Sequence, residues 1–344
     1  MTVRDDRPRR CGILLQGNSR DCLLSNNLPM ARGVHRSGRW PMTTSPSPQL
    51  ATVVVAYHSG AWLPACLART PRPVWVIDNS PAPAAPPAGA HYEHHPENLG
   101  FAGAVNRAFA LTTEPFVLVL NPDCLLLGGV DSMVAEFNDP RVGAVGGRLV
   151  DASGQTQTGF TVRRFPGALS LAFEILGINR LFPANAVNQR YRCLDLDLTR
   201  KQAVDQPAGA FLMMRREAWQ SIGGWDQQFH PVWFEDVDFC KRLKTANWAI
   251  RYIPEATAQH AGGHSVSQMS GTSKTAAWYG SLLRYSGKHL SRAGRWLVAL
   301  SMIVSMLPRG AVGAMREGTL APMRVQLRMT GLAIKRLIFE DLGT

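Results

Sequence analysis

Short runs of apolar residues, several of them β-branched, alternate with helix-like stretches from residue 52 onward. The run at 52–57 is typical of a strand that is buried on both faces, as in a parallel sheet. We expect strands at 52–57, 74–77, 91–95 and 116–120, and helices at 62–68 and from about 100 to 111. This alternation predicts an α/β fold with a doubly wound, mostly parallel sheet, in which ligands bind beyond the carboxyl ends of the strands.

Acidic residues follow two of these predicted strands. Asp78 comes directly after the second strand, and Asn121-Pro122-Asp123 comes directly after the fourth. Because proline cannot continue a strand ladder, Pro122 is expected to stop the strand and to hold Asp123 at the carboxyl edge of the sheet. There its oxygens can bind a divalent cation that bridges a diphosphate. An aspartate at this position is also a common turn former, so the motif alone has a structural reading too.

The second half of the chain contains an acidic cluster at the start of a predicted helix. Glu235, Asp236 and Asp238 lie within four positions and repel one another unless a helix N-terminus, a cation or a substrate offsets their charge. The spacing puts Asp236 on the inward face of the helix, with Phe239, Cys240 and Leu243. Asp236 is therefore a candidate general base that takes a proton from an acceptor hydroxyl. The alternative is acidic capping of an ordinary helix.

A histidine follows the last predicted strand. We expect strands at 142–150, 211–214 and 250–253, and a long insertion from about 154 to 204. The last strand leads to His260, which precedes a pair of glycines. A neutral imidazole at this place can bind a metal ion or contact a phosphate, although a histidine in a surface loop is a common alternative.

The basic charge of the chain is concentrated at its C-terminal end. The net charge is +12 and the isoelectric point is near 9.9, which favours an anionic partner. From Lys274 onward there are eleven basic and three acidic residues. The apolar run 296–307 is shorter than the roughly twenty residues of a membrane span, and arginines flank it. We expect a helical, basic tail that lies on an anionic membrane surface, or else a buried helix, and no binding of nucleic acid, because apolar runs interrupt the charges.

The N-terminal end and the cysteines carry no recognisable chemistry. Residues 1–50 show no helical or strand period, so we expect a disordered extension or a start site assigned too early, with Met42 just ahead of the first strand. The six cysteines are scattered without a C-x-x-C pair, which argues against a zinc module or a disulfide framework. A reducing cytoplasm is the natural compartment for such a chain.

Taken in order, these motifs resemble those of the family 2 glycosyltransferases, which are inverting enzymes with a nucleotide-sugar-binding fold of the GT-A type. The resemblance is to the bacterial rhamnosyltransferase-like branch, and it runs from about residue 52 to 265. Its most specific segment is 97–106, Glu-Asn-Leu-Gly-Phe-Ala-Gly-Ala-Val-Asn. The chain departs from the family at Asn121, because many relatives carry Asp-x-Asp where this chain has Asn121-Pro122-Asp123.

The resemblance implies a role for each candidate residue. Asp236 would be the catalytic base, and Asp123 with His260 would hold Mg²⁺ or Mn²⁺ on the diphosphate. Trp233 and Glu235 would bind the acceptor. The implied contacts to the nucleotide and the rest of the donor are Tyr57, Asp78, Asn98, Gly100, Asn106, Asn121 and Asp123. Helix capping by Asn98, close packing at Gly100 and core packing of Trp233 are the structural alternatives.

The resemblance also implies the activity and its place in the cell. The best match is transfer of L-rhamnose from dTDP-L-rhamnose to a hydroxyl of a lipid-linked or polysaccharide acceptor, with UDP-sugars and GDP-mannose as open alternatives. We expect a catalytic domain at 51–268 and the tail at 269–344, in a cytoplasmic protein at the inner face of the plasma membrane. A nucleotidyltransferase usually has Arg or Lys in the loop after its first strand, whereas 58–62 contains neither. A non-catalytic protein that binds sugars or nucleotides is the other alternative.

Overall fold

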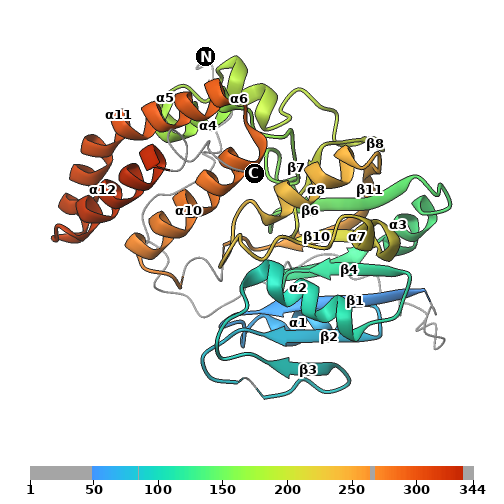
Figure 1. The fold of residues 1–344 in the computed structure, drawn as a ribbon. Helices are drawn as coiled ribbons and strands as arrows, with labels where there is room; N and C mark the ends of the chain where they lie inside the picture. The colour runs from blue at the N-terminus through green and yellow to red at the C-terminus, as the bar shows by residue number, and fades with distance from the viewer. Residues whose placement is uncertain (1–48, 84, 264–267, 336–344) are drawn as a thin grey trace, which may run out of the picture. The chain divides into compact units, whose positions relative to one another are not determined.

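A nine-stranded mixed sheet forms the centre of the computed structural model, which describes residues 49–83, 85–263 and 268–335 (Figure 1). The strand order is β3-β2-β1-β4-β10-β6-β11-β5, and β8 also pairs with β11. Residues 1–48 of the predicted N-terminal extension lie outside the described residues. The strands are β1 Leu50–Ala56, β2 Val74–Asp78, β3 His91–His94, β4 Phe116–Leu120, β5 Cys124–Gly128, β6 Val142–Val150, β8 Gln202–Ala203, β10 Phe211–Arg215 and β11 Ala249–His260.

Most strands of this sheet run in one direction. β1 pairs in parallel with β2 and β4, β2 pairs in parallel with β3, and β6 pairs in parallel with β11. Between the two groups, β10 is antiparallel to both β4 and β6, so the two groups point the same way. The carboxyl ends of β1, β2, β4 and β11 therefore meet at one edge of the sheet, as the predicted fold class requires.

Helices cover both faces of the sheet, because successive side chains of a buried strand point to opposite sides. Val54 and Leu118 belong to one core cluster, whereas Val53 and Val119 belong to the other. The first cluster is completed by α1 Leu63–Leu67 and α3 Val130–Glu136, and the second by α2 Gly100–Leu111, α7 Arg216–Ser221 and α8 Glu235–Thr245. The doubly wound α/β fold class is confirmed.

The insertion at about 154–204, for which we predicted no helix or strand, folds into short helices and a small second sheet. β7 Val162–Arg163 pairs with β9 Gln206–Pro207 in antiparallel fashion. Between them lie α4 Ala168–Leu176, α5 Ile178–Leu181 and α6 Ala186–Tyr191. This segment matters for function because it starts and ends beside the carboxyl edge of the main sheet, as the contacts of Gln157 and Gln206 show below.

Three helices form the C-terminal extension, which is helical as predicted. They are α10 Gly271–His289, α11 Arg292–Glu317 and α12 Ala321–Ile334. The hydroxyls of Ser270 and Ser291 accept hydrogen bonds from backbone N–H groups at the starts of α10 and α11, as good N-caps do. A third core cluster joins these helices to α4 and to Phe234 and Val237 at the start of α8.

A buried ion-pair cluster ties α8 to the end of α10. Asp238 is fully buried, and its carboxylate contacts Arg242 Nε at 2.7 Å, Lys288 Nζ at 2.8 Å and His289 Nε2 at 2.7 Å. Burial alone would raise the pKa of Asp238, but the hydrogen bonds from His289, Lys288 and Arg242 hold it at about 2. Because this folded-state pKa lies below the ordinary value near 3.9, the ionised carboxylate stabilises the fold above about pH 4. That contribution is lost as the pH falls toward 2.

We expect Asp238→Asn to lower the free energy of unfolding by about 3–5 kcal/mol at pH 7, because the substitution removes a buried carboxylate that pairs with Arg242, Lys288 and His289. The loss should shrink below pH 4, because the carboxyl of Asp238 in the unfolded chain is protonated there and the stabilisation by the ionised carboxylate falls. Denaturant unfolding at pH 7 and pH 3.5 measures both effects. Asp131→Asn, at an exposed position of α3, is the control and should change stability by less than about 0.5 kcal/mol. An equal loss at both pH values would contradict the assignment.

Candidate active site

Four of the predicted site segments meet at the carboxyl edge of the main sheet. Tyr57 follows β1, Asp78 ends β2, Asp123 follows β4, and His260 ends β11. His260 lies opposite Cys124 in the β11–β5 pair, and Ala261 N donates to the Asp123 carbonyl at 3.1 Å. The fold therefore brings together residues that are up to 200 positions apart in the chain.

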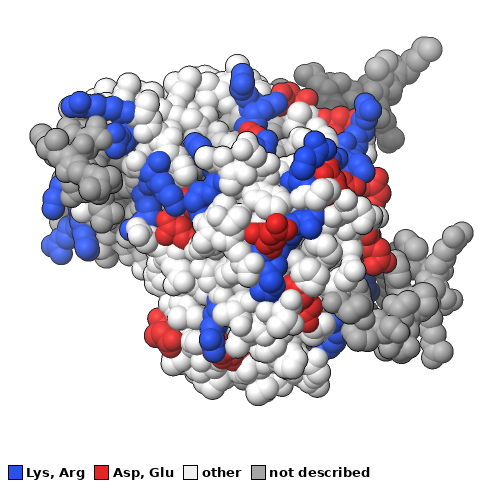
Figure 2. Space-filling model, turned by 45° about the vertical axis from the view of Figure 1, so that its right-hand side comes forward, with Lys and Arg blue, Asp and Glu red and all other residues white. Residues whose placement is uncertain are grey.

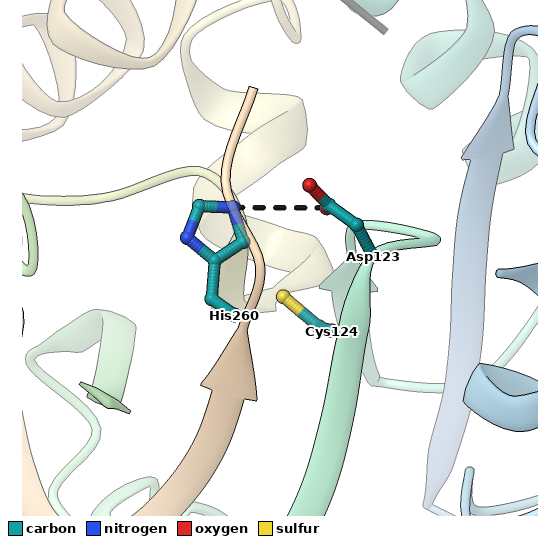
Figure 3. Close-up of side chains that lie close together, drawn as sticks. All are labelled: Asp123, Cys124 and His260. Carbon is teal, nitrogen blue, oxygen red and sulfur yellow. Dashed lines mark ion pairs between the residues drawn. The ribbon is translucent and has the colours of Figure 1, made fainter. Parts of the chain in front are cut away.

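Asp123 and His260 face each other across the candidate metal centre (Figure 3). Both side chains are buried, and His260 Nε2 lies 3.6 Å from Asp123 Oδ1. The Phe160 ring stacks on the imidazole with a centroid separation of 5.0 Å. The imidazole is thus held in place, with one nitrogen directed at the carboxylate.

Gln157 determines which nitrogen of His260 carries the proton. The Gln157 amide Nε2 donates to the His260 carbonyl at 2.7 Å, so its Oε1 is the atom that lies 2.9 Å from His260 Nδ1. Nδ1 must then donate, which leaves a lone pair on Nε2. Burial lowers the pKa of His260, although the Asp123 charge raises it. A neutral imidazole therefore presents a lone pair to a carboxylate, and a cation between them would satisfy both.

Cys124 is the third member of this group, whose candidate ligand atoms all lie within 4.8 Å of one another (Figure 3). Its Sγ donates to the Ala210 carbonyl at 3.5 Å. Burial, together with the charge of Asp123, raises the pKa of the Cys124 thiol well above its usual value. A protonated thiol is a poor ligand, so the donors that fit are the Asp123 oxygens and the His260 nitrogen. These suit Mg²⁺ or Mn²⁺, whose other positions would be filled by diphosphate and water.

Asp236 is held at the start of α8 by three hydrogen bonds. Its Oδ2 accepts from Gln206 Nε2 at 2.9 Å and from Gly209 N at 3.1 Å, and its Oδ1 accepts from Val237 N at 2.8 Å. Gly209 packs closely against this carboxylate, because a Cβ there would lie 3.1 Å from the Asp236 Cβ. A carboxylate can accept about four hydrogen bonds, so one acceptor position remains for a substrate hydroxyl. Burial raises the pKa of Asp236, which makes it a stronger base than an exposed aspartate.

Adjacent residues hold the candidate base and the candidate metal ligands. Gly209 N donates to Asp236, while the carbonyl of Ala210 accepts from Asn121 N at 2.9 Å and from the Cys124 thiol. The pairing of Phe211 with Leu120 in the β10–β4 ladder fixes this arrangement. A proton acceptor and a cation site are thus anchored on one short segment, which is the arrangement that displacement at a sugar carbon requires.

A comparison with models of protein families identifies the family of the chain. The model described as "Glycosyltransferase like family 2" matches residues 85–281, which is more than half of the chain. The chain belongs to glycosyltransferase family 2. The glycosyltransferase activity and the α/β fold predicted from the motifs are confirmed at this level.

Known proteins similar to this glycosyltransferase include rhamnosyltransferases. The N-acetylglucosaminyl-diphospho-decaprenol L-rhamnosyltransferase of Mycobacterium tuberculosis is 29% identical over 246 residues, which cover 64% of this chain and 78% of that protein. Rhamnosyltransferase WbbL of Escherichia coli is 24% identical and is matched over 58% of this chain and 69% of its own length. Among solved structures, Staphylococcus aureus TarS 1–349 with UDP-GlcNAc is 13% identical, with a TM-score of 0.48 and coverage of 84% of this chain and 81% of that one.

Three residues of the 97–106 segment have structural roles in this family 2 enzyme. The Asn98 side chain accepts from Gly100 N at 2.9 Å and so holds the turn that leads into α2. At Gly100, φ is +72° and a Cβ would lie 2.8 Å from His230 Cδ2, so only glycine fits. The Asn106 amide donates to the Trp225 carbonyl at 2.7 Å and accepts from Trp225 N at 2.9 Å. Asn106 therefore secures a loop, and its role as a donor contact stays a prediction.

The remaining predicted residues differ in how accessible they are. Asp78 is buried and accepts from Ser80 N at 2.9 Å and from the Tyr92 hydroxyl at 2.7 Å, whereas Tyr57 and Asn121 are half-buried at the carboxyl edge. Glu235 is buried, and its pKa is raised well above the usual value by burial and by the charge of Asp236. Trp233 is half-buried against the third core cluster.

The sequence motifs missed the residues that orient the site. Gln157 binds His260 and Gln206 binds Asp236, and both lie in or next to the insertion that showed no regular pattern. Asn79 accepts from Leu99 N at 3.2 Å and donates to the Gly100 carbonyl at 3.1 Å, which ties the end of β2 to the start of α2. Of these three residues, only Asn79 had a signal in the sequence, because it is a polar residue directly after a predicted strand.

Proposed function

We propose that this family 2 glycosyltransferase uses Asp236 as the general base of an inverting transfer from a nucleoside diphosphate sugar. The observation that carries the proposal is the Asp236 carboxylate, which keeps one free acceptor position, has a raised pKa and is anchored on the same segment as the Asp123–His260 pair. A carboxylate placed to take a proton from the acceptor supports direct displacement at the sugar carbon.

In the proposed reaction the acceptor hydroxyl donates a hydrogen bond to Asp236, which takes the proton as the acceptor oxygen attacks the anomeric carbon. The bond from that carbon to the donor diphosphate breaks on the opposite face, and the configuration inverts. Asp123 and His260 would hold a divalent cation, which supplies positive charge for the leaving diphosphate. Gln157 keeps the imidazole in the tautomer that can bind the cation, and Gln206 keeps Asp236 oriented.

For the donor we propose dTDP-L-rhamnose, and for the acceptor a lipid-linked or polysaccharide hydroxyl. The motifs resemble the rhamnosyltransferase branch, and two relatives are named as rhamnosyltransferases, one of them acting on a sugar attached to decaprenyl diphosphate. We retain Trp233 and Glu235 as acceptor contacts. The donor contacts that we retain are Tyr57, Asp78, Asn98, Gly100, Asn106, Asn121 and Asp123. We also retain the division into a catalytic domain at 51–268 and a tail at 269–344 as a proposal.

A thermal-shift panel tests this function. UDP, GDP, dTDP and CMP are each added with and without Mn²⁺, and a ligand at about 100 times its Kd should stabilise the folded state by about 2.7 kcal/mol. We expect the largest increase in Tm with dTDP and Mn²⁺ together. A larger shift with UDP or GDP would replace the proposed donor, and no metal-dependent shift with any nucleotide would refute the proposed function.

A membrane-facing role for the tail is part of this proposal. α11 is long and apolar enough to cross a membrane by length and composition, but a third of its most apolar window is buried. One face packs inward through Val298 and Met302, and the opposite face exposes Trp296, Leu300, Ile303, Val304 and Leu307. Basic side chains crowd the left-hand edge of the surface in Figure 2. Such a face fits a helix that lies on an anionic membrane rather than across it.

We expect the double substitution Val304→Glu and Leu307→Glu to weaken binding to vesicles of phosphatidylcholine and phosphatidylglycerol by at least about tenfold, because two exposed apolar side chains lose their burial in lipid. Co-sedimentation measures the bound fraction. Leu127→Glu, at an exposed position of β5, should bind as the wild type does. Unchanged binding of the double variant would refute the role of this face.

A further inference from the structure

Arg163 is a charged side chain that neither the motifs nor the proposed mechanism uses. It ends β7, it is half-buried, and its Nε donates to the Gly159 carbonyl at 2.8 Å. Within the part of the chain that the structure describes, no carboxylate forms an ion pair with its guanidinium. A half-buried arginine without an acidic partner is a ready site for an anion.

The small second sheet places Arg163 on the same side as the candidate base. In the β7–β9 pair, Arg163 lies directly opposite Gln206, so the two side chains share one face. Gln206 Nε2 in turn donates to Asp236 Oδ2 at 2.9 Å. Burial raises the pKa of Asp236, and the charge of Arg163 acts in the opposite direction. The guanidinium is therefore close enough to influence the base.

The Phe160 ring connects Arg163 to the candidate metal ligands. The guanidinium carbon lies 5.5 Å from the centroid of this ring, and His260 stacks on the same ring at 5.0 Å. Arg163 is thus adjacent both to the group that would receive the proton and to the group that would hold the cation. In an in-line displacement the base lies on the nucleophile side of the sugar carbon and the cation lies on the leaving-group side, so a side chain next to both groups borders the space for the donor diphosphate.

We propose that Arg163 binds a phosphate oxygen of a diphosphate in the active site. Its planar fork of N–H donors matches a phosphate group, and Nε already anchors the side chain through Gly159. The inference rests on the proposed function, and the diphosphate has two sources of the same chemistry, the nucleotide donor and a lipid-linked acceptor. Arg163 would add its positive charge to that of the cation, for which Asp123 and His260 supply only one carboxylate and one imidazole.

Binding and kinetics of Arg163→Gln and Arg163→Lys test the inference in the full-length protein. Calorimetry with Mn²⁺ measures affinity for dTDP and for inorganic pyrophosphate, which has no base or sugar. We expect Arg163→Gln to weaken both by about 10- to 100-fold, as for hydrogen bonds to a charged group. Arg163→Lys should recover part of the loss, because it keeps the charge but not the fork. Arg200→Gln, which removes an exposed arginine of the same insertion, is the matched control and should bind as the wild type does.

The second arm separates the two sources of the diphosphate. If Arg163 binds the diphosphate of the acceptor, Arg163→Gln should raise the KM for a lipid diphosphate acceptor at least tenfold and leave dTDP affinity unchanged. Unchanged dTDP and pyrophosphate affinity together with an unchanged acceptor KM would overturn the inference alone. Failure of the wild type to bind dTDP or pyrophosphate would overturn it together with the proposed function. A fold defect would appear as a lower Tm without ligand, and lack of any recovery in Arg163→Lys would then count against the inference.

Discussion

Replacing Asp236 with Asn is expected to lower kcat by about 10²- to 10⁴-fold, because the amide cannot take the proton from the acceptor hydroxyl. Donor affinity should change little, since the amide oxygen of asparagine can still accept from Gly209 N and the metal ligands are untouched. A single-turnover transfer assay, combined with the nucleotide thermal shift, separates these two quantities. Asp131→Asn again serves as the control, because this aspartate is exposed on α3, outside the candidate site.

The pH dependence of transfer provides a second readout for Asp236. The base must be ionised to act, so kcat/KM should rise as the pH rises through its pKa. Because burial raises that pKa, the rise should occur at a higher pH than the ordinary value near 3.9. The rising limb should disappear in Asp236→Asn. Equal transfer by this variant and the wild type would show that another group is the base.

Replacing Asp123 with Asn is expected to remove the Mn²⁺-dependent part of the nucleotide thermal shift and to lower kcat/KM by roughly 10²- to 10³-fold. Asp123 is the only carboxylate of the candidate metal group among the residues that the structure describes, because Asn121 stands where relatives have an acid. The loss of charge stabilisation on a leaving group is worth several kcal/mol. Titration with Mn²⁺ at a fixed nucleotide concentration measures the effect.

A graded variant distinguishes metal binding from a general disturbance of the site. Gln157→Met removes the hydrogen bond that sets the His260 tautomer while keeping a similar volume, and it should weaken Mn²⁺ affinity about 10- to 100-fold. Saturating Mn²⁺ should then restore most of the activity of Gln157→Met but not that of Asp123→Asn. If Asp123→Asn kept a full Mn²⁺ response, the assigned metal centre would be wrong.

The sheet was predictable because its strands are short apolar runs with clear ends. The predicted strands at 116–120 and 142–150 have the observed bounds, and the predicted start of a helix near Glu235 agrees with α8. Burial on both faces imposes a nearly continuous apolar pattern on such strands, which a single sequence displays locally. The residues at the strand ends, such as Asp123 and His260, follow from the same pattern together with the direction of the strands.

The orientation of the site was not predictable, because it depends on contacts between distant residues. Gln157 and His260 are 103 positions apart, and Asn106 and Trp225 are 119 positions apart. Neither glutamine nor asparagine has a local pattern that shows whether its amide will meet a ligand or another part of the chain. The motif segment 97–106 illustrates the difficulty, since nothing in it shows that the Asn106 amide binds the backbone of Trp225.

The Asp238 cluster has a consequence for any attempt to shorten the chain. Two of its three partners, Lys288 and His289, come from the end of α10, whereas Asp238 lies two residues beyond the candidate base. A fragment that ended at residue 268 would leave this carboxylate against Arg242 alone and would uncover Phe234 and Val237. The C-terminal helices therefore stabilise the start of the helix that carries the candidate base.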